Sequence, residues 1–240
     1  MKDWCEAHPH ADRVTFGIMS GMGNELIFEG AIFDQDGLLF DTEILFERSW
    51  KQAGQEFGVE VPDQMTNQCC GCGKGELPGV VSRFFPEIDV PAYIERVLEL
   101  AAEAQMSSIP VLKPGAREML ARCREFGVKT AVASSSMRHL VDHNLGSTGL
   151  DGFFDAIVTG RDVENGKPAP DIFLLAAERL GVDPARCVVF EDAFTGIRAA
   201  HAAGCHPVLV PDRVRPTAEI LEVCDCRETL LDALPLIGTV

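Results

Sequence analysis

From residue 115 onward, short apolar runs of strand length alternate with longer segments in which apolar residues recur at helical spacing. A separate run from Leu26 to Phe33 consists mostly of β-forming residues and alanine, and it predicts a buried strand that ends at Asp34. The later alternation predicts helices at 115–126, 137–145, 170–180 and 195–203, and strands at 128–133, 156–159, 187–190 and 207–210. Strands that alternate with helices form parallel sheets covered on both faces, so we expect an α/β fold with a Rossmann-like, doubly wound parallel sheet.

The segment between the first strand and residue 112 has only a helical pattern. Apolar residues from Leu45 to Phe57 recur at helical spacing and predict a helix over 42–57 that Gly58 ends. Further helices are expected at 77–85 and 91–105, with no convincing strand among them. We therefore predict a catalytic core over 26–43 and 112–240, interrupted by an all-helical cap domain at 44–111. Residues 1–25 show no sustained period and are expected to form an N-terminal extension outside this fold.

Composition and charge restrict the classes of partner. The 240 residues include 46% hydrophobic and 24% charged positions, which is typical of a soluble globular protein. The formal net charge is -16 and the chain has no basic run, which disfavours binding to nucleic acid or to acidic membranes. No apolar stretch reaches the ~20 residues of a membrane span, and the first residues lack the order of a secretory signal. We therefore expect a cytoplasmic location.

The nine cysteines form no evenly spaced framework, and their odd number fits reduced thiols better than a disulfide scaffold. Two clusters stand out, one at Cys69, Cys70 and Cys72, the other at Cys224 and Cys226. Their spacing does not match the Cys-x-x-Cys pairs of structural zinc sites. We expect incidental or buried thiols, and no function for these cysteines follows from the sequence.

Two aspartates, Asp34 and Asp36, stand two residues apart where the first apolar run meets Gly37. Alternate residues of an extended chain face the same side, so both carboxylates can reach one crevice while Gly37 lets the chain turn away. Enzymes with parallel sheets bind ligands at this end of their strands. The alternative is an ordinary aspartate turn at the end of a strand, and this short string alone does not separate the two.

Three later strand ends also carry polar residues. Serines occupy 134–136 after the strand that ends at 133, Glu191 and Asp192 follow the strand that ends at 190, and a loop with Lys167 follows the strand that ends at 159. Each feature alone has a structural explanation, since serines and acids cap helices and a Lys-Pro pair suits a surface loop. Together they favour a functional site, because all four ends fall on one rim of the predicted sheet.

These residues make the chain resemble the haloacid dehalogenase superfamily, and within it the β-phosphoglucomutase-like phosphatases, whose helical cap is inserted after the first strand. The resemblance spans about 26–210 and follows four motifs in order: FDQDGLLFDTE with Asp34, then Ser134, then GKPAPDIF with Lys167, and finally FEDAFTGIRAA with Glu191 and Asp192. Four motifs in the correct order are far more specific than one short match. The resemblance implies a phosphoric monoester hydrolase that acts on a small phosphorylated metabolite.

Phosphate monoester hydrolysis needs a nucleophile, charge neutralisation on the phosphoryl oxygens and a proton for the leaving alcohol. Asp34 is the candidate nucleophile that forms an aspartyl phosphate, and Asp36 is the candidate acid and base. A crowd of carboxylates beside a phosphate requires a cation, and hard oxygen ligands favour Mg²⁺.

The resemblance implies how the remaining motif residues divide these tasks. The ligands of Mg²⁺ would be the side chains of Asp34 and Asp192 and the main-chain oxygen of Asp36. Glu191 would be either a further ligand or a residue that contacts one of these ligands. Lys167 would add a positive charge beside the nucleophile and the phosphoryl group. Ser134 and Ser135 would supply hydrogen bonds to a phosphoryl oxygen.

Two departures within the superfamily bear on the reaction. Dehalogenases of the superfamily lack the second aspartate, so Asp36 favours phosphoryl transfer. Phosphoglucomutases carry a histidine where this chain has Phe46, and a phenyl ring cannot form the hydrogen bond that couples that histidine to the acid/base aspartate. We therefore favour a phosphatase, with a β-phosphoglucomutase-type isomerase as the alternative and a non-catalytic binding protein on the same fold as a third hypothesis.

Specificity is expected to depend on the cap, which excludes water when it closes. The candidates for substrate contact are Glu43, Phe46, Glu47, Trp50 and Lys74. Each also has a structural alternative as a core or solvated residue, and Lys74 is placed where a second phosphate could bind. Neither the substrate nor the oligomeric state follows from the sequence.

Overall fold

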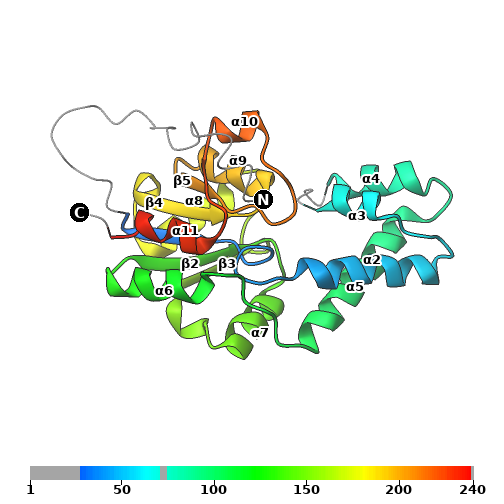
Figure 1. The fold of residues 1–240 in the computed structure, drawn as a ribbon, viewed down its shortest axis with the longest axis horizontal. Coiled ribbons are helices and arrows are strands. Elements are labelled where there is room, and N and C mark those ends of the chain that lie inside the picture. Colours follow the sequence, from blue (N-terminus) through cyan, green and yellow to red (C-terminus); the bar gives the residue numbers. More distant parts are fainter. Residues whose placement is uncertain (1–27, 71–74, 239–240) are drawn as a thin grey trace.

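Six parallel strands form one sheet in the order β3-β2-β1-β4-β5-β6 in the computed structural model, which describes residues 28–70 and 75–238. The strands are β1 (Gly30–Phe33), β2 (Lys129–Ser134), β3 (Ala156–Thr159), β4 (Cys187–Glu191), β5 (His206–Leu209) and β6 (Asp225–Cys226). This order, in which the direction of winding reverses beside β1, is that of a doubly wound sheet. The predicted fold class is therefore confirmed (Figure 1).

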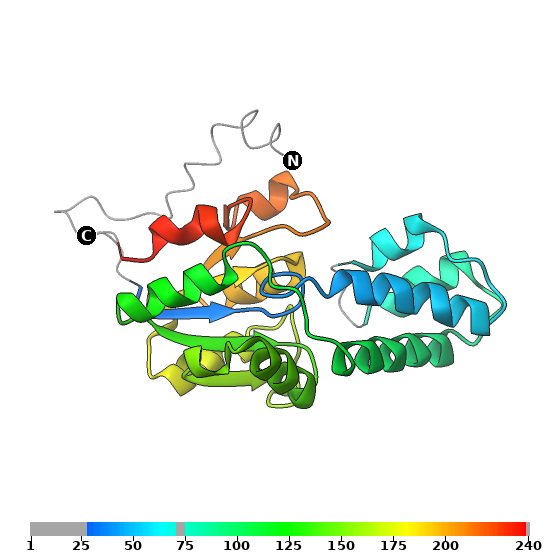
Figure 2. The same cartoon turned by 60° about the horizontal axis from the view of Figure 1, so that its bottom comes forward.

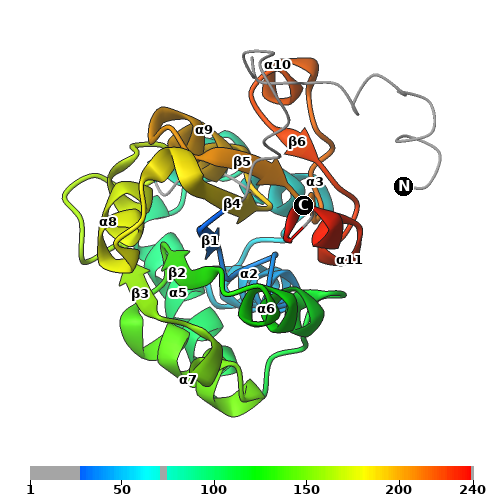
Figure 3. The ribbon, with the colours of Figure 1, turned by 90° about the vertical axis from the view of Figure 1, so that its left-hand side faces the viewer.

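Helices cover both faces of the sheet because successive residues of each strand point to opposite sides. Phe33 packs in one cluster with α6 (Ala116–Glu125), α7 (Arg138–Thr148) and α11 (Leu230–Ala233), whereas Ile32 packs in a second cluster with α8 (Asp171–Leu180) and α9 (Phe194–Ala202). Figure 3, which looks along the sheet, shows these two layers of helices on either side of the strands. The remaining short elements are α10 (Ala218–Leu221) and three 3₁₀ turns at Asp151–Phe153, Pro184–Arg186 and Leu234–Leu236.

Four helices form a separate unit, here called the helical insert: α2 (Glu43–Glu56), α3 (Asp63–Cys69), α4 (Leu77–Phe84) and α5 (Val90–Met106). Its core is centred on Tyr93, whose ring lies against Trp50, Phe57 and Phe85 with centroids 5.3 to 6.1 Å apart. The Tyr93 hydroxyl donates to the carbonyl of Trp50 at 2.9 Å, so the buried phenol is satisfied. Figure 2 shows β1 pointing toward α2, so the insert stands beyond the carboxyl end of this strand.

The two chain segments that join the insert to the core run side by side. Asp41 donates its N–H to the carbonyl of Val111, and Lys113 donates to that of Leu39, both at 2.9 Å. Phe40 and Leu112 form an antiparallel bridge between them. The insert thus leaves and re-enters the core at one place, as the predicted boundaries at 44 and 111 require, although the boundaries themselves stay predictions.

The expected elements agree with the structure except at a few points. The first strand begins at Gly30, because the residue-by-residue pairing with Lys129 and Cys187 starts there, whereas the predicted start at Leu26 lies outside the described residues. Four short elements, α3, α10, β6 and α11, were not expected from periodicity. The predicted extension at 1–25 lies outside the described residues. Within 28–70 and 75–238, no helix has both the length and the apolar character needed to cross a bilayer.

Candidate active site

Asp34 lies directly after β1, between β2 and β4 at the middle of the sheet. Its N–H donates to the carbonyl of Phe190 at 3.0 Å, which continues the pairing of β1 with β4 by one residue. The strand order reverses at this point, and crevices at such points are where doubly wound sheets bind ligands. The fold therefore places the predicted nucleophile at the position where a ligand site is expected.

Lys167 reaches this position from the loop between β3 and α8. Its ammonium group donates to Asp34 Oδ1 at 2.5 Å, to Glu191 Oε1 at 2.6 Å and to the carbonyl of Ala133 at 2.9 Å. Burial alone lowers the pKa of Lys167, but the charges of Asp34 and Glu191 more than reverse this effect, so its pKa is raised. Lys167 is therefore a cation that is held in place by the three hydrogen bonds that its ammonium group donates.

Glu191 ends β4, and Asp192 follows it, so both carboxylates reach the rim beside Asp34. One oxygen from each of Asp34, Glu191 and Asp192 lies within 4.8 Å of the others. Burial raises the pKa of Glu191 and of Asp192, and repulsion from neighbouring carboxylates adds to both shifts. Three acidic groups are thus held together at a cost that a bound cation would relieve.

Glycine is required at two positions around these carboxylates. Gly37 has a φ of +79°, and a Cβ atom there would collide with the carboxylate of Asp192. A Cβ atom at Gly196, near the start of α9, would likewise collide with the carboxylate of Glu191. The loop after β1 and the first turn of α9 can therefore approach the acidic cluster closely only because both positions lack a side chain.

The donor set fits a hard divalent cation. Carboxylate oxygens from Asp34, Asp192 and Glu191 are the ligand type that Mg²⁺ prefers. Among the described residues, Lys167 pairs with Asp34 and Glu191 of this set. The residues present are therefore compatible with the predicted metal site.

Asp36 is held next to Asp34 by the tight loop that follows β1. Its Oδ2 accepts hydrogen bonds from Ser136 Oγ at 2.7 Å and from Gln35 Nε2 at 3.3 Å. Burial raises the pKa of Asp36, and the charge of Asp34 raises it further. Its other oxygen, Oδ1, is buried without a hydrogen-bond partner within the described part of the chain. A carboxyl group whose pKa is raised in this way, next to a nucleophile, is suited to act as an acid.

The three serines at the end of β2, at 134–136, differ in burial and in hydrogen bonding. Ser134 is fully buried at the end of the strand, and its Oγ accepts the N–H of Ser136 at 3.0 Å. Ser135 is exposed on the rim. The hydrogen bond from Ser136 to Asp36 holds the end of β2, with Ser134 and Ser135, at the rim beside Asp36. Phosphate binding by Ser134 or Ser135 remains a prediction. Ser136 was missed, although it stands in the serine run that marked this strand end.

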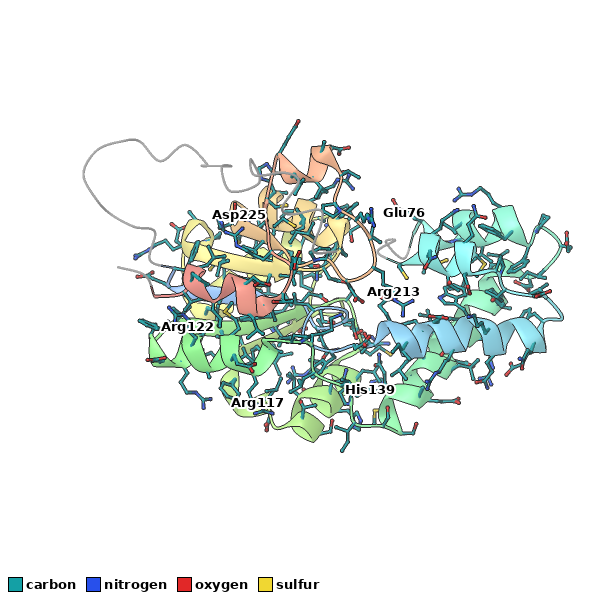
Figure 4. All side chains as sticks on the ribbon, in the orientation of Figure 1. Glu76, Arg117, Arg122, His139, Arg213 and Asp225 are labelled. Atoms are coloured by element: carbon teal, nitrogen blue, oxygen red, sulfur yellow. The ribbon has the colours of Figure 1, made fainter. Side chains whose placement is uncertain are left out.

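The helical insert brings two of its predicted contact residues toward the core. Glu43, at the start of α2, accepts a hydrogen bond from the Cys70 thiol at 3.1 Å, and burial raises the pKa of Glu43. Glu47, one turn later, pairs with Arg213 of the core at 3.0 Å and with Lys51 at 2.8 Å. Figure 4 shows Arg213 in the space between the core and α2.

The other predicted contact residues of the insert are placed differently. Phe46 is half-buried and packs against the core of the insert. Trp50 is 6% exposed and belongs to that core, so its packing gives no support to substrate contact. Lys74 lies outside the described residues. Substrate contact by these residues stays a prediction.

A cavity of about 50 Å³ opens next to Asp192, between the core and the insert. Its lining combines Glu43 and Cys70 from the insert with the start of α9 and the loop after β5: Asp192, Ala193, Phe194, Asp212, Arg213 and Val214. Asp212 and Arg213 were not predicted as site residues. They follow the strand β5, so the same rule about polar residues at strand ends would have found them.

Comparison with known proteins gives consistent matches. The family model described as haloacid dehalogenase-like hydrolase matches residues 31–210. The chain is 39% identical over 186 residues, 75% of its length, to Protein SUPPRESSOR OF QUENCHING 1, chloroplastic, of Arabidopsis thaliana, and the match covers 17% of that protein. It is 33% identical over 177 residues to phosphorylated carbohydrates phosphatase of Thermotoga maritima, covering 73% of the chain and 82% of that protein.

Solved structures support the same relationship. A HAD family hydrolase from Deinococcus radiodurans R1 with bound phosphate and sodium superposes with a TM-score of 0.69 at 26% identity, over 90% of this chain and 100% of that one. The agreement extends through both the sheet and the helical insert, since nearly the whole described chain is covered.

Proposed function

This chain belongs to the haloacid dehalogenase-like hydrolase family, and we propose that it is a Mg²⁺-dependent phosphatase of small phosphorylated metabolites, in particular sugar phosphates. The observation that carries this proposal is the arrangement of Asp34, held by Lys167 and flanked by Asp36, at the reversal point of the sheet. A relative that is 33% identical is named a phosphorylated carbohydrates phosphatase, which supports the substrate class.

The proposed reaction has two steps, each served by residues at the rim. Asp34 attacks the phosphorus atom and forms an aspartyl phosphate, while Asp36 gives its proton to the departing alcohol oxygen. Asp36, now ionised, takes a proton from the water that attacks the phosphorus, which releases inorganic phosphate and regenerates Asp34. Lys167 orients Asp34 through the hydrogen bond that it donates to Oδ1, and it places a positive charge beside the transferred group.

Mg²⁺ would be held by Asp34 and Asp192, with Glu191 as a further ligand or as the partner of one. When bound, it supplies the positive charge that offsets repulsion between these carboxylates and the phosphoryl oxygens. Ser136 and Gln35 orient Asp36 toward the leaving group through the hydrogen bonds that they donate. The helical insert acts as a cap over this rim, which would exclude water during the first step.

Phe46 supports hydrolysis over isomerisation. Its ring packs into the core of the insert and offers no hydrogen bond to Asp36 or to a sugar. Water is therefore the expected acceptor of the phosphoryl group, and β-glucose 1-phosphate should yield free phosphate rather than glucose 6-phosphate, even when a bisphosphate activator is added.

Removal of divalent metal is expected to abolish phosphate release. After dialysis against EDTA the protein should hydrolyse no member of a panel of sugar phosphates, and added Mg²⁺ should restore release while Na⁺ should not. Without the cation, the phosphate dianion would meet a cluster of three carboxylates. Phosphate release is measured colorimetrically, and Asp192→Asn should raise the Mg²⁺ concentration needed for half-maximal rate. Full activity in EDTA would contradict the metal assignment.

Asp36→Asn is expected to lower kcat by about 10²–10⁴-fold for an alkyl phosphate, because the leaving alkoxide then departs without a proton. The decrease should be much smaller for 4-nitrophenyl phosphate, whose leaving group needs no protonation. Steady-state rates with both substrates give this comparison, and Ser136→Ala serves as a milder variant that loosens Asp36 without removing it. An equal loss with both leaving groups would show that Asp36 is not the acid.

The cytoplasmic location stays a prediction. No disulfide joins the seven cysteines in the described part of the chain. The relative from Arabidopsis thaliana carries the word chloroplastic in its name.

A further inference from the structure

The cavity beside Asp192 lies where the leaving group of a phosphate ester would extend from the rim toward the insert. Its lining is formed on one side by Glu43 and Cys70 of the insert and on the other by Asp212 and Arg213 of the core. Whatever is attached to the phosphate must therefore be compatible with these four side chains.

Arg213, the one cation that the structure describes in this lining, and Lys113, which contacts the lining residue Asp212, are both paired. Arg213 donates to Glu47 at 3.0 Å, and Lys113 donates to Asp212 Oδ1 at 2.6 Å. The side chain of Asp212 is 14% exposed and that of Lys113 is 22% exposed, so this second pair is well shielded from water. No described residue of the lining offers an unpaired positive charge to a second anionic group.

The acidic side chains, in contrast, keep free hydrogen-bonding capacity. Asp212 Oδ2 is buried and has no hydrogen-bond partner within the described residues. Glu43 accepts at Oε2 from the weak donor Cys70, and its charge and that of Asp212 act on each other. Carboxylate oxygens are strong acceptors for hydroxyl groups, and a buried acceptor without a partner is costly until one arrives.

We propose that Asp212, together with Glu43, selects substrates whose leaving group is an uncharged, hydroxyl-rich alcohol, and disfavours leaving groups that carry a carboxylate or a second phosphate. This proposal rests on the proposed phosphatase function and assigns specificity within it. Lys113 fixes Asp212 Oδ1, so Oδ2 accepts a substrate hydroxyl, while Phe194 and Val214 provide apolar contact for its carbon chain. A second anion would meet the carboxylates of Glu43 and Asp212, and Arg213, the one cation that the structure describes in this lining, already pairs with Glu47.

Five substrates separate the possible leaving groups: sorbitol 6-phosphate, butyl phosphate, 2-phosphoglycolate, fructose 1,6-bisphosphate and phosphocholine. The kcat/KM for sorbitol 6-phosphate should exceed that for butyl phosphate by about tenfold, because hydroxyl groups satisfy the buried acceptors. It should exceed the values for the two substrates with a second anion by about 100-fold. A preference for either of those anions, or for phosphocholine, would overturn the proposal.

Asp212→Asn tests the residue directly, because asparagine keeps the shape and an oxygen for Lys113 but removes the charge. We expect the ratio of kcat/KM for 2-phosphoglycolate to that for sorbitol 6-phosphate to rise about tenfold. Asp225→Asn is the matched control: Asp225 is 17% exposed and paired with His206 at 3.1 Å, but it lies on β6 outside the cavity lining (Figure 4). An unchanged ratio in Asp212→Asn, or an equal change in the control, would refute the role of Asp212.

Three further measurements test this proposal, and the first of them separates it from the proposed function. Failure to hydrolyse 4-nitrophenyl phosphate with Mg²⁺ would count against the phosphatase itself, whereas its hydrolysis with the wrong preference counts against Asp212 alone. Calorimetric binding of sorbitol 6-phosphate and 2-phosphoglycolate to Asp34→Asn tests the preference without turnover, and tighter binding of the second ligand would overturn it. A bisphosphate preference that Lys74→Met abolishes would assign the selectivity to Lys74 instead and would likewise overturn the proposal.

Discussion

Phosphate release is expected to fall by at least about 10⁴-fold when Asp34 is replaced by asparagine, because the amide cannot attack phosphorus to form an acyl phosphate. Asparagine keeps an oxygen that can accept the hydrogen bond from Lys167, so the fold should be retained. The rates of wild type and Asp34→Asn are compared on the same sugar phosphate panel in Mg²⁺, and circular dichroism and thermal unfolding confirm that the variant is folded.

Two additional results make this test specific to the nucleophile. Rapid acid quenching followed by peptide mass analysis should find one phosphoryl group on the wild-type peptide that contains Asp34, and none on the variant. Asp225→Asn should retain nearly full activity, since it removes a carboxylate on the edge strand β6, which β4 and β5 separate from β1. If Asp34→Asn kept its rate within tenfold of wild type, Asp34 would not be the nucleophile.

Lys167→Met is expected to destabilise the protein by about 3–5 kcal/mol at pH 7.5 in EDTA, because removal of one partner leaves buried charges without compensation. Lys167 contacts both Asp34 and Glu191, and its side chain is 7% exposed. Loss of the ammonium group also removes positive charge from the phosphoryl site, so the variant should be inactive. Urea unfolding gives the free energy of unfolding of both proteins.

The loss of stability in Lys167→Met is expected to depend on pH, and its direction follows from the pKa of Glu191. Burial already raises the pKa of Glu191 above its ordinary value, and removing Lys167 raises it further in the folded state. A carboxyl group whose pKa is raised in the folded state destabilises that state at pH values above its pKa in the unfolded chain. This destabilisation decreases as the pH falls through the pKa of the folded state. The destabilisation should therefore shrink between pH 7.5 and pH 5.5.

Lys129→Met is the appropriate comparison for this experiment. Lys129 donates to the carbonyl of Leu180 at 2.7 Å but has no carboxylate partner in the structure. Its loss should cost only about 1 kcal/mol, with little dependence on pH in this range. Equal losses in the two variants would show that the buried ion pairs of Lys167 contribute no special stability.

Part of the candidate site could be predicted because its residues are fixed by strand ends. A buried strand is visible as an apolar run, and the residue after it must lie at the rim of a parallel sheet. Asp34, Glu191 and Asp192 were placed by this reasoning, and the structure brings one oxygen of each within 4.8 Å of the others. Lys167 comes from a loop, and only the resemblance to a known family indicated that it would reach Asp34.

Other contacts depend on distances that no local pattern contains. Ser136 reaches Asp36 across 100 positions of sequence, and Arg213 reaches Glu47 across 166. Short elements such as β6, with two residues, and α10, with four, contain too few positions to show a period. Trp50 packs in the core of the insert, which is the structural alternative that its helical spacing allowed.

The paired connecting segments at 39–41 and 111–113 bear on how such enzymes diversify. Because the chain leaves and re-enters the sheet at hydrogen-bonded neighbours, the insert occupies what is in effect one surface loop of the core. Insertions at closely spaced ends disturb the parent domain little. A lineage can therefore exchange or reshape this loop-borne unit while the rim of the sheet, with Asp34 and its hydrogen-bond partners, stays unchanged.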